Sequence, residues 1–228
     1  LDTGQEDADS LGVGSRLAGP WVQGLPWWVT LRGDNLVARH FETGKEQRFL
    51  FPLEGCEADR FYATEQWVVV SCPEQGLLRW SWSDPTRPTM YPLSDLKVEV
   101  QGISDDGQRI VVNRFVERVA FSDSRPAVFE EGRVVWMGDS SHTDLAMSPD
   151  GKWLLREEYE GLTLLDIDKG TEQILLMDLP RGLVWGLDSS EFQVRLNNDS
   201  LLYFSLKEGV AGEVRRTRLM ADGDLSSF

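Results

Sequence analysis

The stretch that decides the fold is WWVTLRGDNLVARHFETGKEQRFLF, Trp27 to Phe51, because it recurs as WLLREEYEGLTLLDIDKGTEQILLM, Trp153 to Met177. The two stretches align without a gap and share a Trp, a Leu, a Gly, a Glu and a Gln at equal positions. Each alternates apolar and polar residues between short turns, which is typical of antiparallel strands. The offset of 126 residues between the two Trp is what three repeats of about 42 residues produce.

The same frame recurs between and after the two copies. Trp67 opens WVVVSC, Arg109 opens RIVVNRF and Phe192 opens FQVRLN. A turn (ATEQ, SDDG, SPDG or DSSE) precedes each later strand, and a short apolar segment before it supplies a fourth strand. A unit of this size cannot bury both faces alone, so units must stack, with the opening aromatic residue filling the space between them. The sequence therefore predicts an all-β five-bladed β-propeller of four-stranded antiparallel blades, with a two-sheet sandwich as the alternative.

The repeat also predicts the domain boundaries. Residues 1–16 read as a flexible linker, 17–219 as one propeller and 220–228 as a tail, with blades at about 17–52, 58–93, 98–136, 143–178 and 183–219. The first blade needs an inner strand at about residues 18–23, and either AVFEE or RVVWM is the outer strand of the third blade. Closure of the ring is left to packing between the first and last blades or to the N-terminal segment. The start at Leu1, without Met, predicts that a longer chain was shortened or processed.

Two stretches resemble a known family of repeats. SDDGQRIVV, at Ser104 to Val112, and SPDGKWLL, at Ser148 to Leu155, are similar to the turn and strand of TolB-type and WD40-like propellers. His142 and Asp166 occupy positions where WD40 repeats carry structural His and Asp, although no Trp-Asp dipeptide occurs. The resemblance implies a propeller that serves as an interaction platform.

The charge of the chain limits its partners. The formal net charge is −15, which disfavours nucleic acid and anionic membranes because both require Lys and Arg at the interface. No apolar run approaches the roughly 20 residues that span a bilayer, so this segment is not expected to insert into a membrane. The acidity favours a basic protein partner, or else simply keeps the chain soluble.

Two cysteines, Cys56 and Cys72, offer a candidate disulfide and no spacing typical of a zinc site. A hairpin that turns near Thr64 to Gln66 would bring position 56 near position 72. Such a bond would suit an oxidising compartment, and the sequence favours an extracytoplasmic location nearly equally with a cytoplasmic domain of a larger protein.

Candidate partner-binding residues gather where the second and third strands of each blade meet, together with the loops between blades. The predicted partner-binding residues on this acidic, aromatic rim are Asp34, Phe115, Glu117, His142, Glu157, Glu158, Tyr159 and Glu160. The sequence predicts no metal site, cofactor or catalytic residue. We therefore expect a non-catalytic protein-binding module, with a carbohydrate-active or other hydrolytic enzyme, using carboxylates in the central channel, as the alternative.

Overall fold

The computed structural model describes residues 27–32, 35–50, 56, 60–72, 76–93, 97–118, 121–138, 145–158, 161–177, 180–186, 188–196, 198, 200–219 and 225–227. Within these ranges the chain is all-β and forms five antiparallel sheets, in each of which strands pair in the order of the sequence. None of the described residues belongs to a helix that would be able to cross a membrane.

We number the sheets from 1 to 5 along the chain. Sheet 1 contains β1 (Trp27–Arg32), β2 (Asn35–His40) and β3 (Glu46–Phe49). Sheet 2 contains β4 (Arg60–Ala63), β5 (Trp67–Cys72), β6 (Gly76–Ser81) and β7 (Asp84–Pro92). Sheet 3 contains β8 (Lys97–Ile103), β9 (Arg109–Arg118), β10 (Phe121–Glu130) and β11 (Arg133–Met137). Sheet 4 contains β12 (Leu145–Met147), β13 (Trp153–Glu158), β14 (Gly161–Asp166) and β15 (Thr171–Leu176). Sheet 5 contains β16 (Pro180–Trp185), β17 (Glu191–Leu196), β18 (Ser200–Lys207), β19 (Val210–Leu219) and β20 (Leu225–Ser227).

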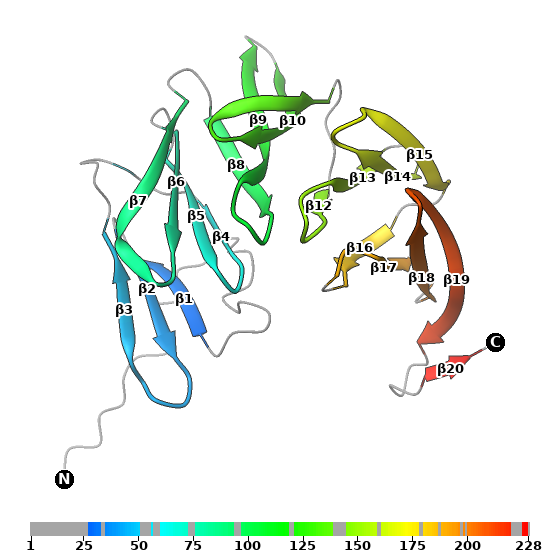
Figure 1. The fold of residues 1–228 in the computed structure, drawn as a ribbon, viewed down its shortest axis with the longest axis horizontal. Coiled ribbons are helices and arrows are strands. Elements are labelled where there is room, and N and C mark those ends of the chain that lie inside the picture. The colour runs from blue at the N-terminus through cyan, green and yellow to red at the C-terminus, as the bar shows by residue number, and fades with distance from the viewer. Residues whose placement is uncertain are drawn as a thin grey trace.

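The sheets follow one another around an arc, with the first strands of sheets 2 to 5 toward its centre (Figure 1). Four clusters of buried apolar side chains fill the spaces between consecutive sheets. This arrangement is consistent with a five-bladed β-propeller, in which stacking buries the face that a single sheet leaves in water.

Aromatic residues at the start of the second predicted strand pack between sheets, as the repeat predicted. Trp27 and Trp67 lie against the clusters on either side of sheet 2, while Trp153 and Phe192 belong to the space between sheets 4 and 5. In β17, Phe192 and every second residue after it are buried, while the residues between them are exposed. This alternation is the reason that such a segment forms a strand.

The outer strand of sheet 3 is β11, which is RVVWM, while AVFEE falls largely within β10. The C-terminal segment 220–228, predicted to be a tail, contributes β20, which pairs with the end of β19 through Leu219 and Leu225. The predicted linker 1–16 and the predicted inner strand at residues 18–23 lie outside the described residues, so sheet 1 is described by three strands.

Candidate functional site

The predicted site lies at one edge of the sheets, which we call the rim. It is formed where the second strand of a sheet ends and the third begins, at Cys72, Arg118, Glu158 and Leu196. Glu157 and Glu158 are the last residues of β13 and pair with Leu162 and Gly161. The strand pairing therefore brings two of the predicted carboxylates to this edge, and the side chain of Glu157 is half-buried there.

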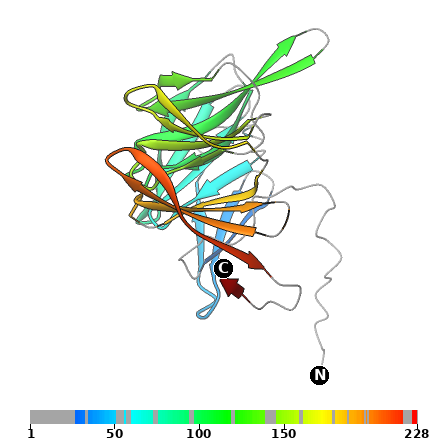
Figure 2. The same ribbon diagram turned by 90° about the vertical axis from the view of Figure 1, so that its right-hand side faces the viewer.

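Phe115 and Glu117 lie within a strand rather than in the loop that the sequence suggested. Strand β9 continues to Arg118, and these two residues pair with Ser124 and Ser122 of β10. The resulting β9–β10 hairpin extends beyond the other sheets (Figure 2). The hairpin includes the polar segment FSDSR, and it continues there because backbone pairing does not require apolar side chains.

The remaining predicted rim residues are described less fully. For Phe115, Glu117 and Glu158 the structure describes the backbone alone, and Asp34, His142, Tyr159 and Glu160 lie outside the described residues. The composition of the rim surface therefore stays a prediction.

The opposite edge of the sheets, which we call the turn face, carries the turns between the first and second strands of sheets 2 to 5. The SDDG and SPDG turns have the same internal bonds, since Ser104 Oγ donates to Asp106 Oδ1 at 2.6 Å and Ser148 Oγ to Asp150 Oδ1 at 2.7 Å. Gly107 has a left-handed backbone, with φ 72°, and because it lacks a Cβ atom the Trp67 ring lies directly against it.

Each turn is also bonded to the turn of the next sheet. The indole Nε1 of Trp67 donates to the Asp105 carbonyl at 2.8 Å, and Asp105 N donates to the Pro149 carbonyl at 2.7 Å. Asp150 N in turn donates to Ser189 Oγ at 2.9 Å. The turns that carry the family resemblance therefore fasten sheets 2 to 5 together, which is a structural role.

Two arginines make further contacts between residues of the turn face. Arg109 bonds to Glu130 in its own sheet and to the Gly151 carbonyl and Asp168 in sheet 4. Arg79 stacks between the rings of Trp67 and Tyr91 and donates to the Gly107 carbonyl. Arg109 opens its strand at the position where the other repeats carry Trp or Phe, and a cation at an aromatic position of the repeat is the sequence signal that could have predicted this role.

Carboxylates gather on the turn face around Asp105. Partial burial raises the pKa of Asp105, and the nearby carboxylates of Glu65, Asp106 and Asp150 raise it further. Among the described residues, no group of His, Cys, Asp and Glu has an arrangement that could hold a metal ion.

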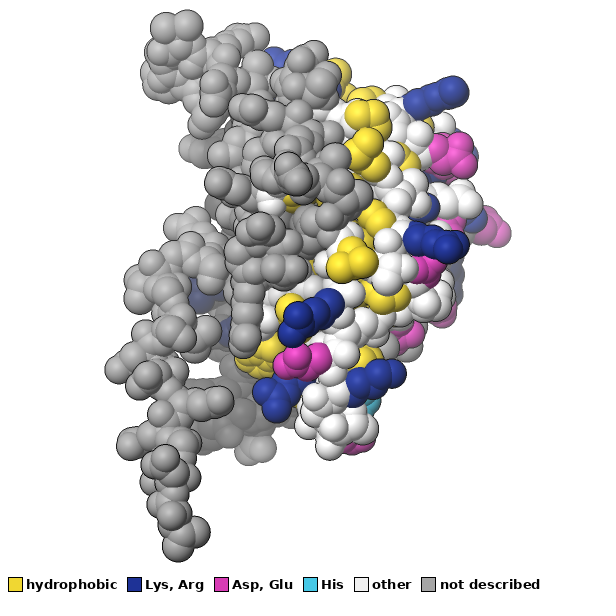
Figure 3. All heavy atoms as spheres, turned by 90° about the vertical axis from the view of Figure 1, so that its left-hand side faces the viewer, with side chains coloured by type: hydrophobic (Ala, Val, Ile, Leu, Met, Phe, Trp, Pro, Cys, Tyr) yellow, Lys and Arg dark blue, Asp and Glu magenta, His cyan; other side chains and the backbone are white. Residues whose placement is uncertain are grey.

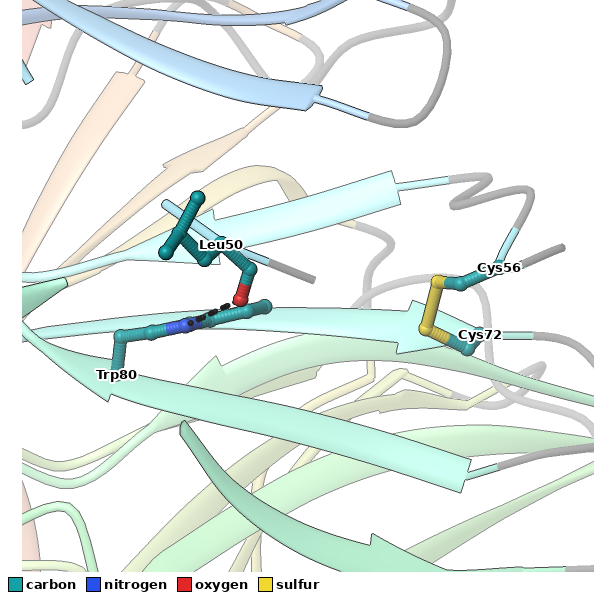
Figure 4. Close-up of a disulfide and its surroundings, with 4 residues drawn as sticks. All are labelled: Leu50, Cys56, Cys72 and Trp80. Carbon is teal, nitrogen blue, oxygen red and sulfur yellow. Dashed lines mark hydrogen bonds between the residues drawn. A yellow bond between two sulfur atoms is a disulfide. The ribbon is translucent and has the colours of Figure 1, made fainter. Parts of the chain in front are cut away.

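Cys56 and Cys72 form a disulfide with a Cα–Cα distance of 5.2 Å. The β4–β5 ladder ends at the pair Arg60 and Ser71, so Cys56 reaches Cys72 from beyond the ladder rather than as a cross-strand neighbour. Figure 4 shows the bond in the space between sheets 1 and 2, where Trp80 Nε1 also donates to the Leu50 carbonyl at 3.3 Å. Both sulfur-bearing residues are buried, and the bond ties the chain after sheet 1 to the rim end of sheet 2.

A pocket of about 380 Å³ lies on sheet 1, on the face turned away from sheet 2. Trp28 and Phe41 form two of its walls, with ring centroids 6.5 Å apart and an interplanar angle of 71°. Arg39, Glu46 and Thr30 supply polar groups. On the side of sheets 1 and 2, hydrophobic side chains reach the surface among charged ones (Figure 3), and the exposed apolar residues of these sheets include Phe41, Leu50 and Met90.

No protein-family model matches the sequence, and no curated protein matches it. Many solved structures match the chain in shape, among them a chain from "Crystal Structure of Mitotic Checkpoint Complex". That match has a TM-score of 0.44 and 10% identity, and it covers 89% of this chain and 80% of the other. A similarity of this size carries no argument about function.

Proposed function

We propose that this chain is a non-catalytic, five-bladed propeller module of the WD40-like or TolB-like type that binds a basic protein through its acidic, aromatic rim. The observation that carries the proposal is the position of Glu117, Glu157 and Glu158, which the strand pairing brings to the same edge of sheets 3 and 4. Tyr159 and Glu160 follow Glu158 directly in the sequence, Asp34 lies between β1 and β2, and His142 lies in the segment between sheets 3 and 4.

The difference between the two edges of the sheets supports the choice of the rim as the binding surface. On the turn face, the backbone and side-chain groups of Asp105, Asp150 and Arg109 are already used to join neighbouring sheets. The rim carries the projecting β9–β10 hairpin, and a protruding hairpin beside the predicted acidic residues at the end of β13 is well suited to contact another protein. The net charge of −15 would raise the rate of encounter with a basic partner.

A buried disulfide between Cys56 and Cys72 fits an oxidising environment, which supports an extracytoplasmic location as our proposal, with a cytoplasmic domain of a larger protein as the alternative.

The alternative is a hydrolytic enzyme with two facing carboxylates in the central channel. Within the described residues, the inner strands β4, β8, β12 and β16 carry one carboxylate, Glu99, and its Oε1 accepts a hydrogen bond from Gln101 at 2.8 Å. This arrangement does not favour glycoside hydrolysis, which needs a second carboxylate about 5–10 Å away.

The test compares the wild-type protein with a rim variant, Glu157→Lys combined with Glu158→Lys and Tyr159→Ala. Each protein is immobilised and incubated with a lysate of the source cells, and retained proteins are quantified by mass spectrometry. The matched control, Glu42→Lys with Glu191→Lys, reverses two exposed carboxylates away from the rim.

We expect a basic protein that the wild type and the control retain and the rim variant loses, at least tenfold, because charge reversal at a partner surface costs more than about 1.4 kcal/mol. If the rim variant retains the same proteins in the same amounts, the rim is not the binding surface.

A further inference from the structure

Among the described sheets, sheet 5 alone has a strand beyond its fourth. β20 pairs antiparallel with the rim end of β19, over three residue pairs that run from Thr217 and Ser227 to Leu219 and Leu225 (Figure 1). The free edge of a sheet presents unpaired N–H and C=O groups and readily accepts another strand. The outer edge of sheet 5 therefore binds an extended segment, which in this molecule comes from the chain itself.

The outer strands of the other sheets are less suited to accept a strand. β7 contains Pro85, Pro88 and Pro92, which have no N–H group to donate. β11 has five residues, and its pairing is interrupted by the register shift opposite Val128 and Phe129. β3 and β15 have four and six residues, whereas β19 has ten. The longest described outer strand is therefore the one that an additional strand covers.

Only the rim half of β19 is available for strand pairing. In the other half, the Gln173 side chain of β15 already bonds both main-chain groups of Ala211, since Nε2 donates to the carbonyl at 2.8 Å and Oε1 accepts from N at 3.0 Å. The register then shifts, which leaves Val214 without a partner residue in β18. Pairing is regular again beyond Val214, and within the described part of the chain β20 pairs with the last three residues of the stretch from Arg215 to Leu219.

This five-residue stretch is strongly basic. It contains Arg215, Arg216 and Arg218 and no carboxylate, although the chain as a whole carries −15. Arg215 is exposed and stacks over the Tyr203 ring. Arg216 is also exposed, and its Nε and Nη2 donate to Glu213, which leaves a guanidinium with further donors. Because opposite charges on paired strands stabilise a sheet, this edge favours an acidic strand.

The other described carboxylates of sheet 5 lie toward the turn face. Glu191 is opposite Ser205, which in turn is opposite Gly212, so it lies before the register shift of β19. Glu208 and Asp188 belong to turns at the same edge of the sheet. These carboxylates therefore do not neutralise the arginines at the rim half of β19.

We infer that Arg215 to Leu219 is a binding site for an extended, acidic segment of a partner protein, and that β20 occupies part of this site from within the chain. Such a segment pairs with all five residues, two more than β20 pairs with, and places its carboxylates beside the arginines. It competes with β20, which is tethered and therefore has a high effective concentration. The site differs from the rim in position and in the charge of the partner that it selects.

The experiment uses the full-length protein with Ser226→Pro, which keeps the length of the chain and weakens β20. Leu225→Pro is the second variant, because neighbouring residues of a strand direct their N–H groups to opposite edges and one of the two faces β19. Ser226→Ala is the matched control. The probe is a fluorescently labelled peptide, Asp-Val-Glu-Val-Asp-Val, and its affinity is measured by anisotropy. We expect one of the proline variants to bind the probe about tenfold more tightly than the wild type and the control do.

Two further comparisons separate strand pairing from general attraction. The same peptide with alternate N-methylated residues cannot donate main-chain hydrogen bonds and should not bind. Adding Arg215→Glu and Arg216→Glu to the proline variant should weaken binding about tenfold, while adding Arg133→Glu, on the exposed edge strand β11, should not. The net charge of −15 repels an acidic peptide, so binding of this probe requires a specific site.

Three results would overturn the inference. The first is equal affinity of the probe for the wild type and both proline variants, and the second is equal binding of the N-methylated peptide. The third is a proline variant that dimerises without the probe in sedimentation velocity, which would show that a second copy takes the edge. Unchanged hydrogen exchange in sheet 4 shows that each variant is folded. No basic partner enters this experiment, so its outcome is independent of the proposal for the rim.

Discussion

The guanidinium of Arg109, at the start of β9, donates a hydrogen bond to the carboxylate of Asp168, which follows β14 in the neighbouring sheet. The same guanidinium donates to Glu130 at 3.1 Å and to the Gly151 carbonyl at 2.9 Å. One side chain therefore joins sheets 3 and 4 through two acceptors in sheet 4 and one in its own sheet, at a position where the other repeats carry Trp or Phe.

We predict that Arg109→Ala lowers the free energy of unfolding by about 1–3 kcal/mol, because it removes charge-assisted bonds and leaves the Gly151 carbonyl without this donor. Asp168→Asn should cost less than about 1 kcal/mol, since the Asp168 side chain is 52% exposed. Urea unfolding measures both. Arg133→Ala, an exposed arginine of the same sheet, is the control and should change stability by less than about 0.5 kcal/mol. A loss for Arg109→Ala no larger than that of the control would show that the bridge does not stabilise the fold.

Reduction of the Cys56–Cys72 bond should lower the free energy of unfolding by about 2–4 kcal/mol, because the bond closes a loop with a sequence separation of 16 and restricts the unfolded chain. The double variant Cys56→Ser with Cys72→Ser should show the same loss and become insensitive to reductant. Thermal unfolding with and without reductant measures the effect, and intact mass after alkylation counts the thiols. Free thiols in the unreduced protein would contradict the bond itself.

Two aspartates of the turn face should respond to neutralisation with opposite signs. The raised pKa of Asp105 means that its ionisation costs the folded state free energy as pH rises from about 4 through the raised pKa. Asp105→Asn should therefore raise Tm at pH 7, by about 1–2 °C for a surface group.

Asp188 is the matched comparison. Bonds from the side chain and backbone of Ser190 lower the pKa of Asp188, so its charge stabilises the fold above pH 4 and this contribution is lost as pH falls through the lowered pKa. Asp188→Asn should therefore lower Tm at pH 7 and leave it unchanged near pH 2. Differential scanning calorimetry at the two pH values tests both variants, and a shift of the same sign for both would contradict the electrostatic account.

The repeat made the strands predictable. Trp27, Trp67, Trp153 and Phe192 mark equivalent positions in the sequence, and all four lie between sheets in the structure. Their period-two surroundings specify a strand locally, so no knowledge of distant contacts is needed to find them. The SDDG and SPDG turns were predictable for the same reason, since Asp106 and Asp150 bond within their own turns.

The candidate site was less predictable. A loop was expected around Phe115 and Glu117 because the repeat places the connection between the second and third strands there, but β9 and β10 continue to pair. Main-chain hydrogen bonds hold such a hairpin regardless of side-chain polarity, so the length of the other repeats does not predict where this one ends.

The sequence by itself therefore determined the strands, their turns and the number of repeats, because alternation and turn chemistry act over a few residues. Tertiary structure alone decided which groups meet across sheets. Asp105 bonds to Pro149, Asp150 to Ser189 and Arg109 to Asp168 because consecutive sheets pack against one another. These partners are tens of residues apart, and nothing in the local pattern of either one specifies the other.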